Sequence, residues 1–157
     1  MTKDFILAAI GDELNKQFLI LQKAVKQAHE SATDDENIAE NKYDTTGLEA
    51  SYLVQGQARR LDEIEQSIIE FREFSLPENS ALIQLGSLVK VIEKQNESFF
   101  FLSPQAGGME IEHDGNTILI TTFYSPIGKA LLGKKSGDRI DINVAGKART
   151  LHIESVE

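Results

Sequence analysis

The sequence predicts an α+β protein, with an N-terminal antiparallel helical hairpin followed by a small antiparallel β domain that carries one short helix. Two observations predict this class. Apolar residues recur at helical spacing before Pro77, whereas they alternate or gather in short β-rich runs after it. We therefore expect a helical hairpin over residues 1–76 and a β-rich domain over residues 77–157.

The first helix is predicted over about residues 3–30, because apolar residues recur there three or four positions apart. These residues are Leu7, Ile10, Leu14, Phe18, Leu21, Val25 and Ala28. A lone helix cannot bury such a stripe, so it requires a second element to pack against.

The second helix supplies that partner. Its stripe consists of Val54, Ala58, Leu61, Ile64, Ile68 and Phe71. Thr46 and Glu49 have the spacing of a capping box at its start, and Pro77 closes it. Gly56 is a weak point inside this helix. Two long stripes joined by a polar connection predict a coiled-coil-like hairpin.

The connection between the helices is acidic. Asp34, Asp35, Glu36, Glu40 and Asp44 place five carboxylates in eleven residues. Such a segment can be a solvated loop whose polar residues cap helix ends. It can also present oxygen ligands to a hard metal ion. The residues alone leave both interpretations open.

After Pro77, short apolar runs separated by turn residues predict strands. A hairpin is expected from the runs 88–92 and 98–102, and further strands are expected at 117–121, 139–144 and 149–156. Ser125 and Pro126 have the form of a helix start, with serine at the N-cap and proline at the first helical position. This helix is expected to stop at Gly133.

Composition excludes several classes of protein. The net charge is −9, and residues 1–75 hold 8 Lys and Arg against 15 Asp and Glu. We therefore expect no autonomous DNA or RNA binding, because contacts to phosphates require a basic face. The chain has no cysteine, which excludes disulfides and thiolate metal sites. No membrane-spanning run or secretory signal is evident, so we expect a cytoplasmic protein and no membrane partner.

No catalytic set assembles along the chain, so we expect it not to be an enzyme in its own right. His29, His113 and His152 are isolated and lack the spacing of a metal site or of a nucleophile–base pair. No tightly bound cofactor is expected.

The run from Ser125 to Asp138 resembles the Ser-Pro-helix-Gly-Lys-x-x-Gly-Asp signature in the C-terminal domain of Gre-type transcript-cleavage factors. The closing residues 153–156 are similar to the last strand of that family. The resemblance covers residues 87–157 and extends over 40–70, while residues 1–39 share only the architecture. It implies an FKBP-like β domain.

The resemblance also implies a partner and a mechanism. Gre-type factors place their hairpin in the secondary channel of RNA polymerase, where carboxylates at the tip help to hold a second Mg²⁺ for cleavage of backtracked RNA. Carried over to this chain, Asp34, Asp35, Glu36 and Glu40 are the candidate metal ligands, with Mg²⁺ shared with the polymerase. Ser125, Pro126 and Ile127 are the candidate polymerase-binding residues, on the helix face away from the sheet. The factor would act as a monomer and would at most complete the polymerase active site.

The tip departs from the family pattern Asp-x-x-Glu-Asn followed shortly by Tyr. Glu40, Asn41 and Tyr43 fit its second half, but the aspartate position falls on Asn37. Two alternatives follow: a factor that stimulates cleavage, and a competitor that only occupies the channel. An FKBP-like isomerase or chaperone, with a pocket lined by aromatic residues, and a coiled-coil adaptor that dimerises through the hairpin are alternatives from other classes. The aromatic residues available for such a pocket are Phe99, Phe100, Phe101, Phe123 and Tyr124.

Overall fold

A computed structural model describes residues 3–33, 46–78 and 80–157 of the chain. The chain divides into two compact units. One, which we call the β unit, comprises Met1–Ile10 and Glu70–Glu157, and the other, the hairpin unit, comprises Gly11–Ile69. No described helix has a stretch that is both long and apolar enough to cross a membrane.

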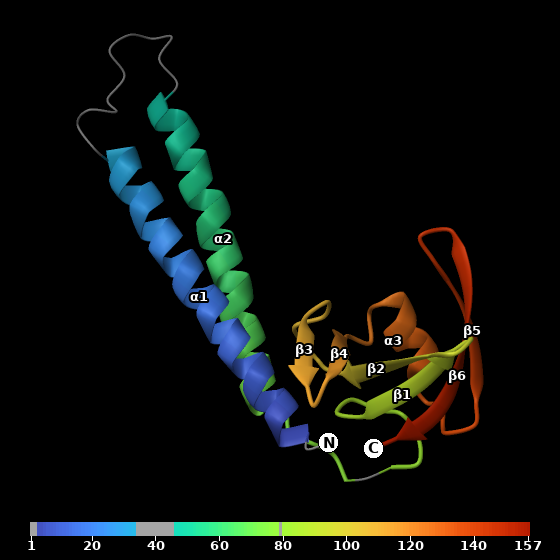
Figure 1. The fold of residues 1–157 in the computed structure, drawn as a ribbon. Helices are drawn as coiled ribbons and strands as arrows, with labels where there is room; N and C mark the ends of the chain where they lie inside the picture. The colour runs from blue at the N-terminus through green and yellow to red at the C-terminus, as the bar shows by residue number, and fades with distance from the viewer. Residues whose placement is uncertain (1–2, 34–45, 79) are drawn as a thin grey trace. The chain divides into compact units, whose positions relative to one another are not determined.

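Two long helices confirm the predicted hairpin. Helix α1 spans Lys3–Thr33 and helix α2 spans Thr46–Glu73, and Figure 1 shows them side by side. Within the hairpin unit, Leu14 and Ile68 are buried, whereas the stripe residues farther along both helices are only half-buried. At the start of α1 the structure buries Ile6 fully and leaves Leu7 half-buried, so the stripe begins one residue earlier than the spacing predicts.

The β unit is built on one six-stranded sheet of order β3-β4-β2-β1-β6-β5. Its strands are β1 (Leu88–Glu93), β2 (Asn96–Leu102), β3 (Glu110–His113), β4 (Asn116–Thr121), β5 (Arg139–Val144) and β6 (Lys147–Val156). All the strands predicted from the sequence are present, and β3 is an addition. Only Ile111 in β3 is buried, so this short edge strand carries a weak apolar signal.

The sheet is mostly antiparallel, as predicted, and it contains one parallel pairing that the sequence did not reveal. Strands β2 and β4 pair in parallel, with Phe99 opposite Ile118 and Leu102 opposite Thr121. The other four pairings are antiparallel. The parallel pair arises because the chain leaving β2 first forms the edge strand β3, which then turns back through Asp114 and Gly115 into β4.

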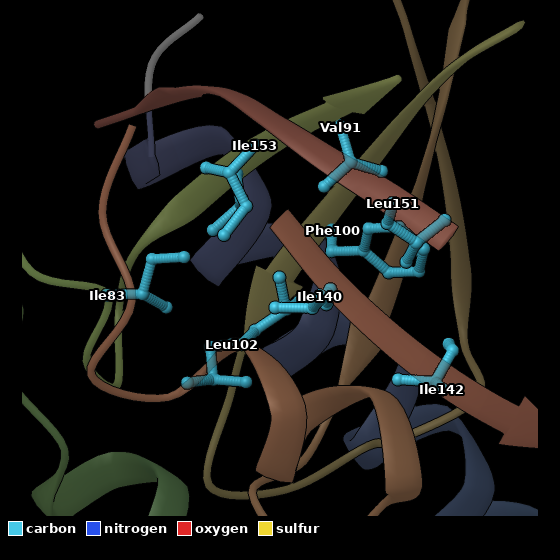
Figure 2. Close-up of a cluster of buried hydrophobic side chains, with 10 residues drawn as sticks. Ile83, Val91, Phe100, Leu102, Ile140, Ile142, Leu151 and Ile153 are labelled. Atoms are coloured by element: carbon cyan, nitrogen blue, oxygen red, sulfur yellow. The ribbon is translucent and has the colours of Figure 1, made fainter. Parts of the chain in front are cut away.

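One face of the sheet is covered by helix α3 (Pro126–Leu131). Figure 2 shows the side chains that meet there from four strands and the segment before β1. The cluster consists of Ile83, Val89, Val91, Phe100, Leu102, Leu131, Ile140, Ile142, Leu151 and Ile153. Ile127 and Ala130 of α3 pack against it. Burying this much aliphatic surface is what holds the short helix in place.

The helical ends that belong to the β unit make specific contacts with its loops and strands. The ring of Phe5 stacks on the ring of His113, with centroids 4.4 Å apart. The side-chain amide of Gln105 donates a hydrogen bond to the carboxylate of Glu70. Gly86 has a positive φ of 86°, and a Cβ there would lie 2.8 Å from Cδ of Pro77. The segment after α2 thus packs closely on the turn before β1.

Candidate functional site

The start of helix α3 is the candidate site that the structure describes in full. Ser125 is the N-cap, with φ −70° and ψ 154°, and Pro126 follows in the first turn, as predicted. Oγ of Ser125 accepts a hydrogen bond of 2.9 Å from the backbone N–H of Gly128. This bond satisfies one of the backbone donors that a helix start leaves without an intrahelical partner.

The remaining bonding capacity of the Ser125 hydroxyl is also used. It donates to the backbone carbonyl of Thr122 at 2.8 Å, and Oγ1 of the buried Thr121 lies 2.6 Å from it. Since a hydroxyl has a single proton to give, Thr121 must be the donor in that second contact. Ser125 therefore holds the loop 121–125 against the first turn of α3.

Gly128 allows this helix to approach the loop. A Cβ at Gly128 would lie 2.0 Å from the carbonyl oxygen of Thr122, a distance at which the backbone would have to move. The glycine of the Ser-Pro-Ile-Gly run is thus required by close backbone packing. The motif builds a rigid helix start.

The surface at this helix start differs from the one expected for Ser125, Pro126 and Ile127. Ile127 is half-buried and packs against the core, so it points toward the sheet rather than away from it. Pro126 is exposed, and Tyr124 beside it is 69% exposed. Tyr124 contacts only the neighbouring ring of Phe123 among the described aromatic residues, at 3.9 Å between centroids. Its place directly before Ser-Pro is a signal that sequence analysis did not use.

Basic side chains accompany the exposed apolar ones around α3. Lys129, Lys134 and Lys135 are exposed and form no ion pair with any residue that the structure describes. Leu82 and Leu132, 50% and 45% exposed, belong to the segments before β1 and after α3, which a Leu82–Lys135 bridge joins. The α3 surface thus combines positive charge with apolar groups in a chain of net charge −9.

A hollow of about 430 Å³ lies beside the start of α3. Phe99, Phe100, Leu119 and Ile127 line it together with Arg149 and the polar residues of the β2 and β4 ends. Of the five aromatic residues considered for an isomerase pocket, only Phe99 and Phe100 line this hollow, while Phe101 is fully buried. The lining of this hollow is therefore mixed polar and apolar, whereas the isomerase alternative expects a pocket lined by aromatic residues.

The hollow is bordered by an ion pair. Arg149 donates to both carboxylate oxygens of Glu93, with Nη2 2.7 Å from Oε2. These hydrogen bonds from the guanidinium lower the pKa of Glu93 and raise the pKa of Arg149. The pair holds Arg149 at the rim of the hollow, where its guanidinium stabilises the fold through Glu93.

The predicted metal ligands Asp34, Asp35, Glu36 and Glu40 lie outside the described residues. Within residues 3–33, 46–78 and 80–157, no group of three or more His, Asp or Glu side chains is arranged to hold a metal ion. His113 pairs with Asp114 at 3.3 Å. A metal site at these four tip residues therefore stays a prediction.

Residues 78–157 match the family described as "Transcription elongation factor, GreA/GreB, C-term". Curated relatives extend the similarity to almost the whole chain. The transcription elongation factor GreA of Rhodospirillum rubrum is 25% identical over 152 residues, which cover 96% of this chain and 92% of the relative. GreA of Cereibacter sphaeroides is 27% identical over 150 residues, which cover 95% and 91%.

Among solved structures, the GreA factor homolog 1 protein of Thermus thermophilus is similar at 22% identity, with a TM-score of 0.39 and 94% of both chains covered. A GreA/GreB elongation factor of Nitrosomonas europaea is similar at 20% identity, with a TM-score of 0.38, and covers 63% of this chain and 90% of its own. The family match spans half of the chain and includes the whole Ser125–Asp138 motif. The chain belongs to the GreA/GreB family of transcription elongation factors.

Proposed function

We propose that this protein regulates transcription elongation by binding RNA polymerase as a Gre-type secondary-channel factor. The observation that carries the proposal is the family match over residues 78–157, which contains the rigid helix start at Ser125. Full-length similarity to GreA proteins supports the same role for the hairpin. Such a factor works where the polymerase works, in the cytoplasm.

The α3 surface is the proposed polymerase contact. Pro126 and Tyr124 are exposed, whereas Ser125 and Ile127 are held by a hydrogen-bond network and by the core. We assign Pro126 and Tyr124 to direct contact, and Ser125 and Ile127 to holding them in place. Lys129 and Lys134, which form no ion pair within the described part of the chain, suit a partner surface that carries carboxylates.

The hairpin would carry the acidic tip into the polymerase. Carboxylate oxygens are the ligands that Mg²⁺ prefers, and Asp34, Asp35, Glu36 and Glu40 supply four of them. A second Mg²⁺ bound there would orient and activate water for phosphodiester cleavage. The chain itself contributes only negative charge and oxygen ligands, so the enzyme in this reaction is the polymerase.

The tip sequence is compatible with two versions of this function: a factor that stimulates RNA cleavage, and a competitor that only occupies the channel. Asn37 occupies the position where the family pattern has aspartate. A neutral amide is a weaker ligand for a hard cation than a carboxylate. Neighbouring carboxylates at Asp34, Asp35 and Glu36 could compensate for the missing charge.

Binding is tested by a pull-down of core RNA polymerase with the full chain. Pro126→Glu and Tyr124→Glu should each weaken capture, because they place a carboxylate on the contact surface while an acidic group at a helix start is tolerated. Asn143→Glu, on an exposed position of β5, is the matched control and should bind like wild type. If both surface variants bind as well as the control, the α3 surface is not the contact.

Cleavage is tested separately with stalled elongation complexes. Changing Asp34, Asp35, Glu36 and Glu40 together to Asn or Gln should abolish any stimulation of cleavage and leave channel occupancy intact. Wild-type protein that binds but never stimulates cleavage, even at high Mg²⁺, would identify the competitor. A neutral tip that behaves like wild type in every assay would make the acidic cluster an ordinary solvated loop.

A further inference from the structure

Four residues of α2 form one face of the helix. Glu49, Leu53, Gly56 and Arg60 are spaced by four, three and four positions, which places them along a single line on the helix surface. All four are exposed, and the Leu53 side chain is 55% exposed. We call them the α2 face. Tyr52, beside Leu53, is 63% exposed. Neighbouring exposed apolar side chains, unlike a single one, indicate a surface that can bind another protein.

A groove runs beside this face within the hairpin unit. It has a volume of about 330 Å³ and is lined by Ala24, Gln27, Ala28, Ser31, Leu53 and Gln57. None of these residues is charged, although 26% of the chain is charged. Ile20, one turn from Ala24 on α1, is 59% exposed. With a net charge of −9, two copies repel each other least where charge is absent.

The order of residues on the α2 face is self-complementary. The midpoint between Leu53 and Gly56 coincides with the midpoint between Glu49 and Arg60. When two copies of α2 pack antiparallel about a twofold axis through that point, Leu53 of one copy faces Gly56 of the other. Glu49 then faces Arg60, and each contact occurs twice. A twofold interface requires one patch that is complementary to itself in this way.

Gly56 has room for the facing leucine. A Cβ built at Gly56 meets no atom within 4 Å, so the fold of the single chain does not require glycine there. Glycine inside a helix weakens it. Its absent side chain leaves a hole into which a leucine knob from another helix fits.

We propose that a second copy of this chain binds the α2 face, forming a weak antiparallel dimer through the hairpin. The small size of the patch makes the dimer reversible and dependent on concentration, so dilute protein is monomeric. The dimer covers the half of the hairpin next to the tip. Self-association would therefore compete with any partner that receives this end of the hairpin.

Sedimentation velocity over a concentration series tests the proposal on the full chain. The mean mass of the wild type should rise from 17.4 kDa toward twice that value. Leu53→Glu should weaken association at least about tenfold, as expected for the loss of a central apolar anchor. Gln55→Glu is the matched control: Gln55 is exposed and points about 100° or more away from each residue of the α2 face, so association should be unchanged.

Charge reversal tests the twofold geometry. Glu49→Arg and Arg60→Glu should each weaken the dimer, because like charges then face each other across the axis. The double variant restores opposite charges and should recover association. A pair of residues that acted only within one helix would show no such rescue in dimer affinity.

Gly56→Gln separates the dimer contact from helix stability. Glutamine is a better helix former than glycine, so the melting temperature of the hairpin should rise. The same side chain fills the hole, so association should fall. Wild type that stays monomeric at every concentration would overturn the proposal, as would equal loss of association in Leu53→Glu and Gln55→Glu.

Discussion

The β unit and the hairpin unit bury their apolar residues to different depths. In the β unit, strands and α3 bring together ten buried aliphatic and aromatic side chains around one cluster. Among the described residues of the hairpin unit, only Leu14 and Ile68 are buried, and the other stripe residues of that unit are half-buried. A sheet with a covering helix encloses side chains from several directions, whereas two helices enclose them from only two. The hairpin is therefore the part that gains most from a partner.

The two units should differ most in the stability that is lost when a leucine is replaced by alanine. Leu151→Ala in the β unit should cost about 2–5 kcal/mol, because Leu151 is fully buried and its removal leaves a cavity. Leu61→Ala in the half-buried hairpin seam should cost less, about 1 kcal/mol, since part of that side chain already meets water. Calorimetric unfolding of the two variants checks this order. Equal losses would mean that the hairpin is as tightly enclosed as the sheet.

Glycine-to-alanine substitution should lower the free energy of unfolding in the β unit and raise it in the hairpin unit. Gly128→Ala in the β unit should cost about 1–3 kcal/mol, because the new methyl group collides with the carbonyl of Thr122. Urea unfolding measures the loss. A substitution at Gly128 that leaves stability unchanged would show that α3 can move away from the loop without penalty.

Gly56→Ala in the hairpin unit should instead stabilise the helix by about 1 kcal/mol, because its Cβ enters open space and alanine favours helix. Thermal unfolding followed by helical circular dichroism should show a higher midpoint. A lower midpoint would mean that Gly56 has a contact within the single chain that demands glycine.

The smallest effect concerns the ion pair of Glu93 and Arg149. Because Arg149 lowers the pKa of Glu93, this carboxylate stabilises the fold above its ordinary pKa, and that contribution is lost as the pH falls through the lowered value. Glu93→Gln should therefore reduce stability slightly at neutral pH and make it less dependent on pH under acid conditions. Urea unfolding across an acidic pH series compares the two proteins. An identical pH dependence would show that the pair contributes nothing.

Sequence patterns predicted the elements whose signal is local. The 3–4 spacing in α1 and α2 comes from the helix period itself, and strands β5 and β6 alternate because one of their faces is buried. The cap at Ser125 and Pro126 was predictable because its hydrogen bond closes within three residues. The family resemblance rested on this same local run and was confirmed by the match over 78–157.

The fold of one chain decided what depends on residues that are distant in sequence. No local pattern states that β4 lies parallel to β2, because that pairing depends on where β3 is placed. Likewise, Ile127 was expected at the surface, and only its packing on the cluster shows that it faces the core. The exposure of Tyr124 and the close approach of Gly128 to the loop before α3 also follow from tertiary packing and not from a local pattern. Sequence by itself determined the family of this protein and every element except the short edge strand β3, and tertiary packing decided which side chains of the motif remain exposed.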